Sequence, residues 1–250
     1  MKILALDSSG LVASVAVVEN DTLLAEYTVN YKKTHSQTLL PMLDEISNMT
    51  ELDLSTIDAI AVAGGPGSFT GLRIGSATAK GLGLALEKPL ISIPTTAAIA
   101  YNIWDTNKFV CPIMDARRNQ VYTGVYCYTD HRLDTVWEQD TMSIEALAEG
   151  LNCLDHEVIF LGDGVAVYRK KLQELLTIPF SFAPAHVNRQ RAAAVAALAE
   201  VYYKEGKIQT AEEHEPEYLR KSQAERERAE WESVKHADVL KKQKNGEKSE

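Results

Sequence analysis

The sequence has few cysteines, no long apolar run and no surplus of positive charge, and each absence excludes a class of protein. The three cysteines, Cys111, Cys127 and Cys153, stand far apart without a Cys-x-x-Cys pair, which argues against a zinc cage and a disulfide framework. No apolar run approaches the ~20 residues that span a bilayer, and Asp7 follows the opening apolar residues too soon for a signal peptide. We therefore expect a soluble, cytoplasmic protein with no membrane contact.

The charge balance bears on nucleic-acid binding. The formal net charge is −9, from 26 Lys and Arg against 35 Asp and Glu. A protein that binds RNA by itself usually carries a basic surplus that displaces phosphate counterions. We therefore expect any contact with nucleic acid to be local or shared with a partner. At 250 residues and 45% hydrophobic content, the chain can still bury a sizeable core.

Metal ligands at helical spacing are also missing. The six histidines, at positions 35, 131, 156, 186, 214 and 236, form no i, i+4 pair that would place two imidazoles on one helix face. The sequence therefore predicts no metal centre and no cofactor. His35 is better interpreted as a helix-start or contact residue than as a ligand.

Apolar runs and turn residues predict the elements of the first half. Three strands over residues 3–7, 12–18 and 23–29 precede a helix over 36–49, with Pro41 expected to kink its first turns. A buried strand (58–63), a helix (70–86), a strand (90–93) and a helix (95–104) follow. The predicted order is βββαβαβα.

The same order then repeats. Strands are predicted over residues 110–115, 120–128 and 133–139, a helix over 144–151, a strand over 158–161 and a final helix over 194–203. Asp115 aligns with Asp7, since each ends an apolar strand before a polar turn. Chance self-similarity is the alternative. We predict an α/β fold of duplicated βββαβαβα units that resembles the actin, sugar kinase and heat-shock ATPase superfold. The expected lobes are residues 1–105 and 106–220, and the last helix of the second can pack back on the first.

A glycine-rich segment, Gly-Gly-Pro-Gly-Ser-Phe-Thr-Gly-Leu-Arg-Ile-Gly over 64–75, lies between a predicted strand and a helix. Its glycines permit positive φ and close backbone approach, and Ser68 or Thr70 can cap the helix at its positive end. No lysine follows the final glycine, so this is not a Walker loop. A tight turn without ligand and an anion site both stay open. The candidate anion or nucleotide contacts are Asp7, Ser8, Gly65, Gly67, Ser68, Thr70, Arg117 and Arg118.

The second acidic turn argues against ATP hydrolysis by the chain alone. A phosphate site needs small residues through which backbone amides approach the phosphates, and residues 115–119 contain no glycine. Arg117 and Arg118 can pair with phosphates or with a carboxylate on another protein. Weak nucleotide contact within a complex stays open.

Small residues recur every four positions along the helix predicted over 70–86. Gly71, Gly75, Ala79 and Gly83 form a stripe that lets another element approach closely. The helix is apolar nearly all round, since only Arg73 and Lys80 are charged. It is therefore buried within the chain or joined to a partner.

These motifs together resemble the TsaB family, also called YeaZ. The family hallmark, Gly-Pro-Gly-Ser-Phe-Thr-Gly-Leu-Arg-Ile-Gly, is intact from Gly65 to Gly75. Further family signposts occur in the expected order at residues 3–7, 35–36, 114–118, 121–122, 162–164 and 218–220. About the last thirty residues fall outside the pattern. The first turn departs slightly, because it reads Asp-Ser-Ser where the family more often has Asp-Thr-Ser.

The resemblance implies an accessory subunit without catalytic residues. Members of the family bind and activate TsaD, which transfers threonylcarbamoyl from threonylcarbamoyl-AMP to N6 of the adenosine 3′ of the anticodon, in tRNAs that read codons beginning with adenine. TsaE, an ATPase, is the third member, a homodimer forms without TsaD, and tRNA is bound only within the complex. The alternative is an autonomous enzyme, either a glycoprotease-type peptidase or a small-molecule kinase.

The family contact implies a partner surface on the first two long helices. The residues expected there are His35, Leu39, Leu40, Met42, Leu43, Gly71, Leu72, Gly75, Ala79, Leu82 and Gly83. Residues 221–250 are dominated by Arg, Glu, Lys and Gln, with Trp231 the lone aromatic, which predicts a charged tail that is a frayed helix or disordered. The alternative for this tail is that Lys241, Lys242, Lys244 and Lys248 touch tRNA within the complex.

Overall fold

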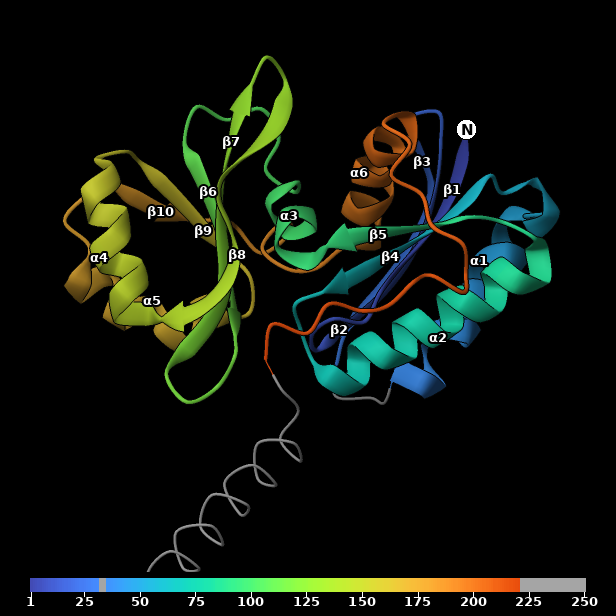
Figure 1. Ribbon diagram of the computed structural model, residues 1–250, viewed down its shortest axis with the longest axis horizontal. Coiled ribbons are helices and arrows are strands. Elements are labelled where there is room, and N and C mark those ends of the chain that lie inside the picture. Colours follow the sequence, from blue (N-terminus) through green and yellow to red (C-terminus); the bar gives the residue numbers. More distant parts are fainter. Residues whose placement is uncertain (32–34, 221–250) are drawn as a thin grey trace, which may run out of the picture. The chain divides into compact units, whose positions relative to one another are not determined.

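Two five-stranded mixed sheets carry the fold of the computed structural model (Figure 1). The structure describes residues 1–31 and 35–220, so the predicted tail over 221–250 lies outside the described residues. Residues 1–218 form one compact unit. Along the described chain, no helix is both long and apolar enough to cross a membrane.

The first sheet has the strand order β3-β2-β1-β4-β5. β1, β2 and β3 are antiparallel, whereas β4 and β5 run parallel to β1. β1 lies in the middle and is covered on both faces, which explains its continuous apolar run. The elements of this half are β1 (Lys2–Asp7), β2 (Val12–Glu19), β3 (Thr22–Asn30), η1 (His35–Gln37), α1 (Leu39–Thr50), η2 (Leu54–Thr56), β4 (Ala59–Gly65), α2 (Phe69–Leu86), β5 (Leu90–Pro94) and α3 (Thr95–Ala100).

The second sheet repeats this arrangement, with the order β10-β9-β6-β7-β8. Its first strand is again central, antiparallel to β7 and parallel to β9. The two halves therefore share both element order and strand order, which confirms the predicted duplicated α/β fold. The elements are β6 (Phe109–Asp115), β7 (Gln120–Thr129), β8 (Arg132–Ser143), α4 (Ile144–Leu154), β9 (Val158–Leu161), α5 (Gly164–Leu175), β10 (Phe180–Phe182) and α6 (Ala192–Lys204).

Asp7 and Asp115 occupy equivalent positions in the two halves. Each is the last residue of a central strand, and each pairs with the adjacent antiparallel strand, Asp7 with Ser14 and Asp115 with Val121. The alignment made from the sequence therefore matches the register of the two sheets.

Helices cover both faces of the first sheet. The apolar residues of α1 and α2 form one core cluster with β1, β2 and β4, and α6 packs against β1 and β2 on the other side. The last helix of the first half, α3, packs on β6 and β7 of the second sheet. Each half thus supplies its final helix to the sheet of the other, while the division into lobes at 105/106 stays a prediction.

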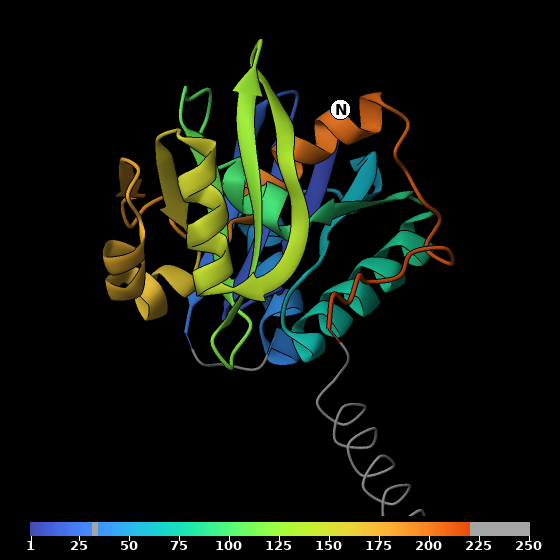
Figure 2. The ribbon, with the colours of Figure 1, turned by 60° about the vertical axis from the view of Figure 1, so that its left-hand side comes forward.

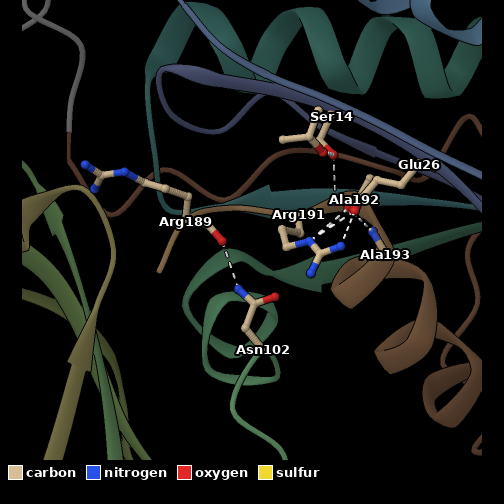
Figure 3. A network of polar contacts seen from close by, with 8 residues as sticks. Ser14, Glu26, Asn102, Arg189, Arg191, Ala192 and Ala193 are labelled. Carbon is tan, nitrogen blue, oxygen red and sulfur yellow. Dashed lines mark hydrogen bonds and ion pairs between the residues drawn. The ribbon is translucent and has the colours of Figure 1, made fainter. Parts of the chain in front are cut away.

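The start of α6 is held by the first sheet (Figure 3). Ser14 Oγ accepts a hydrogen bond from the Ala192 N–H at 2.9 Å, and the Glu26 carboxylate pairs with the Arg191 guanidinium. Because the first N–H groups of a helix lack partners within it, these side chains of β2 and β3 act as its caps. Asn102 donates a hydrogen bond to the Arg189 carbonyl at 2.8 Å, which fixes the segment before α6.

Some predicted boundaries differ from the structure. The helix predicted over 36–49 divides into η1 and α1, so that Pro41 falls in the first turn of α1, where no intrahelical N–H bond is required. The helix predicted over 95–104 ends at Ala100, and β8 continues to Ser143. β10, a three-residue edge strand, was not predicted.

Candidate functional site

The glycine-rich segment forms the turn from β4 into α2. Ser68 is the N-cap, and its Oγ accepts a hydrogen bond from the Gly71 N–H at 3.3 Å. Of the two predicted caps, Ser68 is therefore confirmed, while Thr70 lies inside the helix and is exposed. Gly65 has φ of +124°, a conformation that L side chains rarely adopt.

The turn between β1 and β2 packs directly onto the start of α2. The Ser9 carbonyl accepts a hydrogen bond from the Ser68 N–H at 2.6 Å, and Ser8 Oγ donates one to the Gly71 carbonyl at 2.8 Å. A Cβ on Gly67 would overlap the Ser9 carbonyl oxygen, and one on Gly71 the Ser8 carbonyl oxygen. The geometry favours the tight-turn interpretation of these two glycines, because carbonyl oxygens repel anions. Anion contact elsewhere in the loop stays a prediction.

Asp7 lies beneath this turn and is fully buried. Its Oδ1 accepts hydrogen bonds from the Ser9 N–H at 2.9 Å and from Ser9 Oγ at 2.7 Å. Its Oδ2 has no partner among the described residues. Burial raises the pKa of Asp7 to about 6, against the opposing effects of the Ser9 hydrogen bonds and the His35 charge. The site therefore holds a carboxyl group that titrates above its usual range.

Two further polar side chains with unpartnered atoms surround the same turn. His35 Nε2 lies 2.9 Å from the Gly10 carbonyl oxygen, while its buried Nδ1 has no partner among the described residues. Gln190 is 1% exposed, occupies the space that a Cβ on Gly10 would need, and has an amide without a described partner. An ordered water or a small polar group could supply the hydrogen bonds that these atoms lack within the described residues. Sequence reasoning missed Gln190, because nothing in the chain order links it to this turn.

The second acidic turn is held by a hydrogen bond within its own loop and by hydrogen bonds with Asp163 and Tyr168. Asp115 Oδ1 accepts hydrogen bonds from the Arg117 N–H at 2.8 Å and from the Tyr168 hydroxyl at 3.2 Å. Asp163 Oδ1 accepts one from the Asp115 N–H at 3.2 Å, and burial raises the pKa of Asp163. Arg117 and Arg118 are exposed, with φ of 61° and 54°. Their predicted contact with an anion or with a carboxylate of a partner stays a prediction.

Residues 207–218, which we call the strap, run along α2 in both ribbon views (Figures 1 and 2). Gln209 and Leu90 exchange two backbone hydrogen bonds of 2.8 Å, so the strap closes the β5 edge of the first sheet. Further along, Lys80 Nζ donates a hydrogen bond to the His214 carbonyl at 2.9 Å. The strap therefore holds α2 against the sheet.

The end of the strap links the second sheet to the glycine-rich turn. The Glu217 N–H donates a hydrogen bond to the Gly64 carbonyl at 2.7 Å, and its Oε2 accepts one from Gln139 Nε2 of β8 at 2.6 Å. Gln139 Oε1 in turn accepts a hydrogen bond from Thr96 Oγ1 of α3 at 2.8 Å. Tyr218 packs on Phe69 of α2, with ring centroids 4.7 Å apart.

Burial corrects the predicted partner surface. The small-residue stripe faces inward: a Cβ on Gly75 would overlap Ser8 Oγ, and one on Gly83 the Leu90 side chain. These positions bring α2 close to the sheet of the same chain, so they present no side chain to a partner. The predicted contact residues that are buried are Leu39, Met42, Leu43, Gly71, Leu72, Gly75, Ala79 and Gly83. Leu40 is exposed, and His35 and Leu82 are partly exposed.

The outer faces of α1 and α2 carry other apolar residues that the sequence analysis did not select. Met49 is 78% exposed and Leu84 60%. Ala77 is exposed, and a Cβ on Gly81 would meet open space. Side chains about half a turn from the stripe point the opposite way, but the sequence alone does not show which of the two faces meets the sheet. We call Leu40, Met49, Ala77, Gly81 and Leu84 the outer surface.

Comparisons with known proteins place this geometry in a family. The family model described as TsaD, tRNA N6-adenosine threonylcarbamoyltransferase, matches residues 22–228. The tRNA threonylcarbamoyladenosine biosynthesis protein TsaB of Bacillus subtilis is 32% identical over 231 residues, which cover 92% of this chain and 98% of that protein. TsaB of Escherichia coli is 30% identical over 230 residues, covering 90% and 96%.

A solved structure points to the same family. YeaZ from Pseudomonas aeruginosa superimposes with a TM-score of 0.75 at 27% sequence identity, covering 87% of this chain and 99% of that one. The TsaB proteins of Bacillus subtilis and Escherichia coli match over almost their whole length, and the hallmark segment forms the turn on which the candidate site is built. The chain therefore belongs to the TsaB (YeaZ) family.

Proposed function

We propose that this chain acts in tRNA threonylcarbamoyladenosine biosynthesis as a non-catalytic subunit that binds and activates TsaD. Support comes from the relatives that carry the name of this pathway and from the match to the TsaD family model. TsaE is the proposed third member, and tRNA binds only within the complex. Without TsaD, the chain forms a homodimer.

The packing of the β1–β2 turn carries the proposal that the chain is an accessory subunit. In an ATPase of this superfold, small residues in this region let backbone amides approach phosphates. Here the Ser8 and Ser9 carbonyl groups occupy the space beside Gly71 and Gly67. The Ser68 N–H donates a hydrogen bond to the Ser9 carbonyl, so it is not free to bind a phosphate. This arrangement disfavours phosphate at these positions and is better suited to a rigid support for α2.

The outer surface is the proposed contact with TsaD. Its exposed leucine and methionine side chains on α1 and α2 gain stability when a partner removes them from water. At Ala77 and Gly81, which carry little or no side chain, a partner helix can approach closely. The buried stripe contributes indirectly, since it fixes the position of α2.

Activation requires unequal affinity for two states of TsaD. A subunit that binds the competent state more tightly shifts the population toward that state by the difference in binding free energy. A shift from 1:99 to 99:1 needs a difference of about 5.5 kcal/mol. The strap and the caps of α6 keep the chain rigid enough to discriminate between the two states.

A reconstituted transfer assay tests the proposal. Threonylcarbamoyl-AMP and tRNA are incubated with this chain, with TsaD, and with both, and N6-modified adenosine is quantified. We expect no product with this chain alone and more product with both proteins than with TsaD alone. Modification by this chain without TsaD, or peptide or small-molecule turnover by the pure chain, would support the autonomous-enzyme alternative instead.

A further inference from the structure

An exposed aromatic cluster lies outside the surfaces described so far. Trp104, which follows α3, is 56% exposed. Its ring centroid lies 5.5 Å from that of Tyr101 and 5.4 Å from that of Tyr128 on β7, in edge-on geometry. The two tyrosine rings are 6.5 Å apart. We call these three residues the aromatic shelf, to which the first half contributes two rings and the second half one.

Carboxylates surround the aromatic shelf. Burial raises the pKa of Tyr101, and the negative charges of Asp21 and Glu200 raise it further. Burial likewise raises the pKa of Tyr128, with smaller contributions from Tyr101 and Asp105. Asp105 follows Trp104 directly in the chain, and the Asp21 N–H donates a hydrogen bond to Glu200 Oε1 at 3.3 Å, so that Asp21 and Glu200 lie together.

Three positive groups of the neighbouring segments have partners, and one of these partners is Asp105 itself. Lys207, just after α6, pairs with Glu205 at 2.7 Å and lies over the Tyr202 ring. The amino-terminal ammonium donates a hydrogen bond to Asn20. His131 of the β7–β8 turn lies 2.7 Å from Asp105. The surroundings of the shelf therefore combine aromatic rings with the carboxylates of Asp21 and Glu200 and with the Asp105–His131 pair.

We propose that the aromatic shelf binds a cationic side chain, an arginine guanidinium or a lysine ammonium, presented by a basic segment of a partner protein. The face of an aromatic ring attracts a cation, most strongly for tryptophan, and the neighbouring carboxylates add charge-assisted hydrogen bonds. Single-stranded nucleic acid also stacks on aromatic rings. Its phosphates would meet Asp21, Asp105 and Glu200 here, so protein is the favoured partner.

Fluorescence anisotropy with short labelled peptides tests this proposal. The probes are a nine-residue peptide of alternating arginine and glycine, its lysine and glutamate counterparts, and a nine-nucleotide uridine RNA. We expect the two basic peptides to bind and the glutamate peptide and RNA to bind much more weakly. Trp104→Ala should weaken binding of the arginine peptide by about 5-fold, whereas Trp104→Phe keeps most of the affinity. Thermal unfolding verifies that each variant is folded.

A matched charge control separates the shelf from the overall negative charge. Asp105→Asn removes a carboxylate beside the shelf, and Asp44→Asn removes an exposed one on α1. We expect the first to weaken binding by about 3-fold and the second to have little effect. Equal effects of the two variants, unchanged affinity of Trp104→Ala, or RNA binding that depends on Trp104 would each overturn the proposal. If Trp104→Ala fails to fold, Trp104→Phe and the two charge variants still decide it.

Discussion

The Glu26 carboxylate on β3 accepts a hydrogen bond at 3.1 Å from the backbone N–H of Ala193, which follows it by 167 residues in the chain. The same carboxylate pairs with Arg191, one residue before α6 begins. A side chain of the first sheet thus caps the last helix of the second half. This contact joins residues that are remote in sequence, so its loss should lower the stability of both halves.

We predict that Glu26→Ala lowers the free energy of unfolding by about 1–3 kcal/mol, because it uncaps α6 and leaves Arg191 without its partner. Urea unfolding followed by circular dichroism measures the change. Glu45→Ala, at an exposed position on α1, is the control and should change stability by less than about 0.5 kcal/mol. Glu26→Gln keeps an acceptor and should recover part of the loss. Equal stability of the Glu26 and Glu45 variants would contradict the capping role.

Two glycines of α2 should respond in opposite ways to the same substitution. Gly71→Ala forces a Cβ against the Ser8 carbonyl oxygen, and we expect a loss of about 1–3 kcal/mol. Gly81→Ala meets open space on the outer surface and should gain about 0.5–1 kcal/mol, since alanine favours a helix interior. Thermal unfolding of the two variants side by side measures both effects. The inward orientation of the stripe would be wrong if Gly71→Ala were as stable as Gly81→Ala.

Asp7 should make stability depend on pH. Its pKa is raised from 3.8 to about 6 in the folded chain, so the folded state holds this proton more strongly than the unfolded state does. Its contribution is therefore fully present below pH 3.8 and is lost as the pH rises through 6. A shift of this size corresponds to about 3 kcal/mol.

Asp7→Asn isolates this contribution, because asparagine does not titrate. We expect the native chain to lose about 2–2.5 kcal/mol relative to the variant between pH 4 and pH 7. Urea unfolding at several pH values, for both proteins, gives the difference directly and cancels the titration of shared groups. A difference that stays constant across this range would show that burial does not raise this pKa.

The outer surface predicts which helix variants disrupt association without unfolding the chain. Leu84→Lys and Met49→Lys place charges on exposed side chains, and we expect melting temperatures within about 4 °C of the native value. Binding of TsaD and homodimer formation should weaken by at least about 10-fold, because the charge loses its water on association. Sedimentation velocity with and without TsaD measures both.

Two control variants accompany that experiment, one expected to unfold the chain and one expected to change nothing. Leu39→Lys places an ammonium in the core beneath α1 and should unfold the chain. Thr135→Lys, at an exposed position on β8, should alter neither folding nor binding. If the two outer-surface variants bind TsaD as tightly as the native chain, the contact lies elsewhere.

Glu217 and Gln139 should be energetically coupled. Their side chains share a hydrogen bond of 2.6 Å between the strap and β8, and a charged acceptor strengthens such a bond. A double-mutant cycle with Glu217→Ala and Gln139→Ala should give a coupling free energy of about 0.5–1.5 kcal/mol. Additive effects of the two substitutions would mean that the strap is tied to the glycine-rich turn by its backbone alone.

The order of elements was predictable from sequence because strong local signals mark each boundary. Apolar runs ending at Asp7 and Asp115 predicted the first strand of each half, and the glycines after β4 located the start of α2. The three-residue β10 was too short to produce such a signal. Local composition therefore sufficed for most of the element order, whereas the pairing of the strands was implied only by the resemblance to the superfold.

The inner and outer faces of α2 could not be told apart in the same way. A helix with small residues on several faces shows no clear apolar stripe, and the sheet that it covers is formed by strands distant in sequence. For the same reason Gln190 and Glu217 escaped notice, since each acts on a turn more than a hundred residues away. Which side of a helix faces the core is decided by tertiary packing.

The exchange of α3 and α6 between the two sheets bears on how such a chain could arise. A fragment ending before β6 would leave bare the face of the first sheet that α6 covers, and its own last helix would lose the packing that β6 and β7 supply. Two copies of that fragment could complete each other by trading their terminal helices, as domain-swapped dimers do. The fold thus has the architecture of a swapped pair whose members are joined head to tail, and neither half is expected to be expressed as a folded protein by itself.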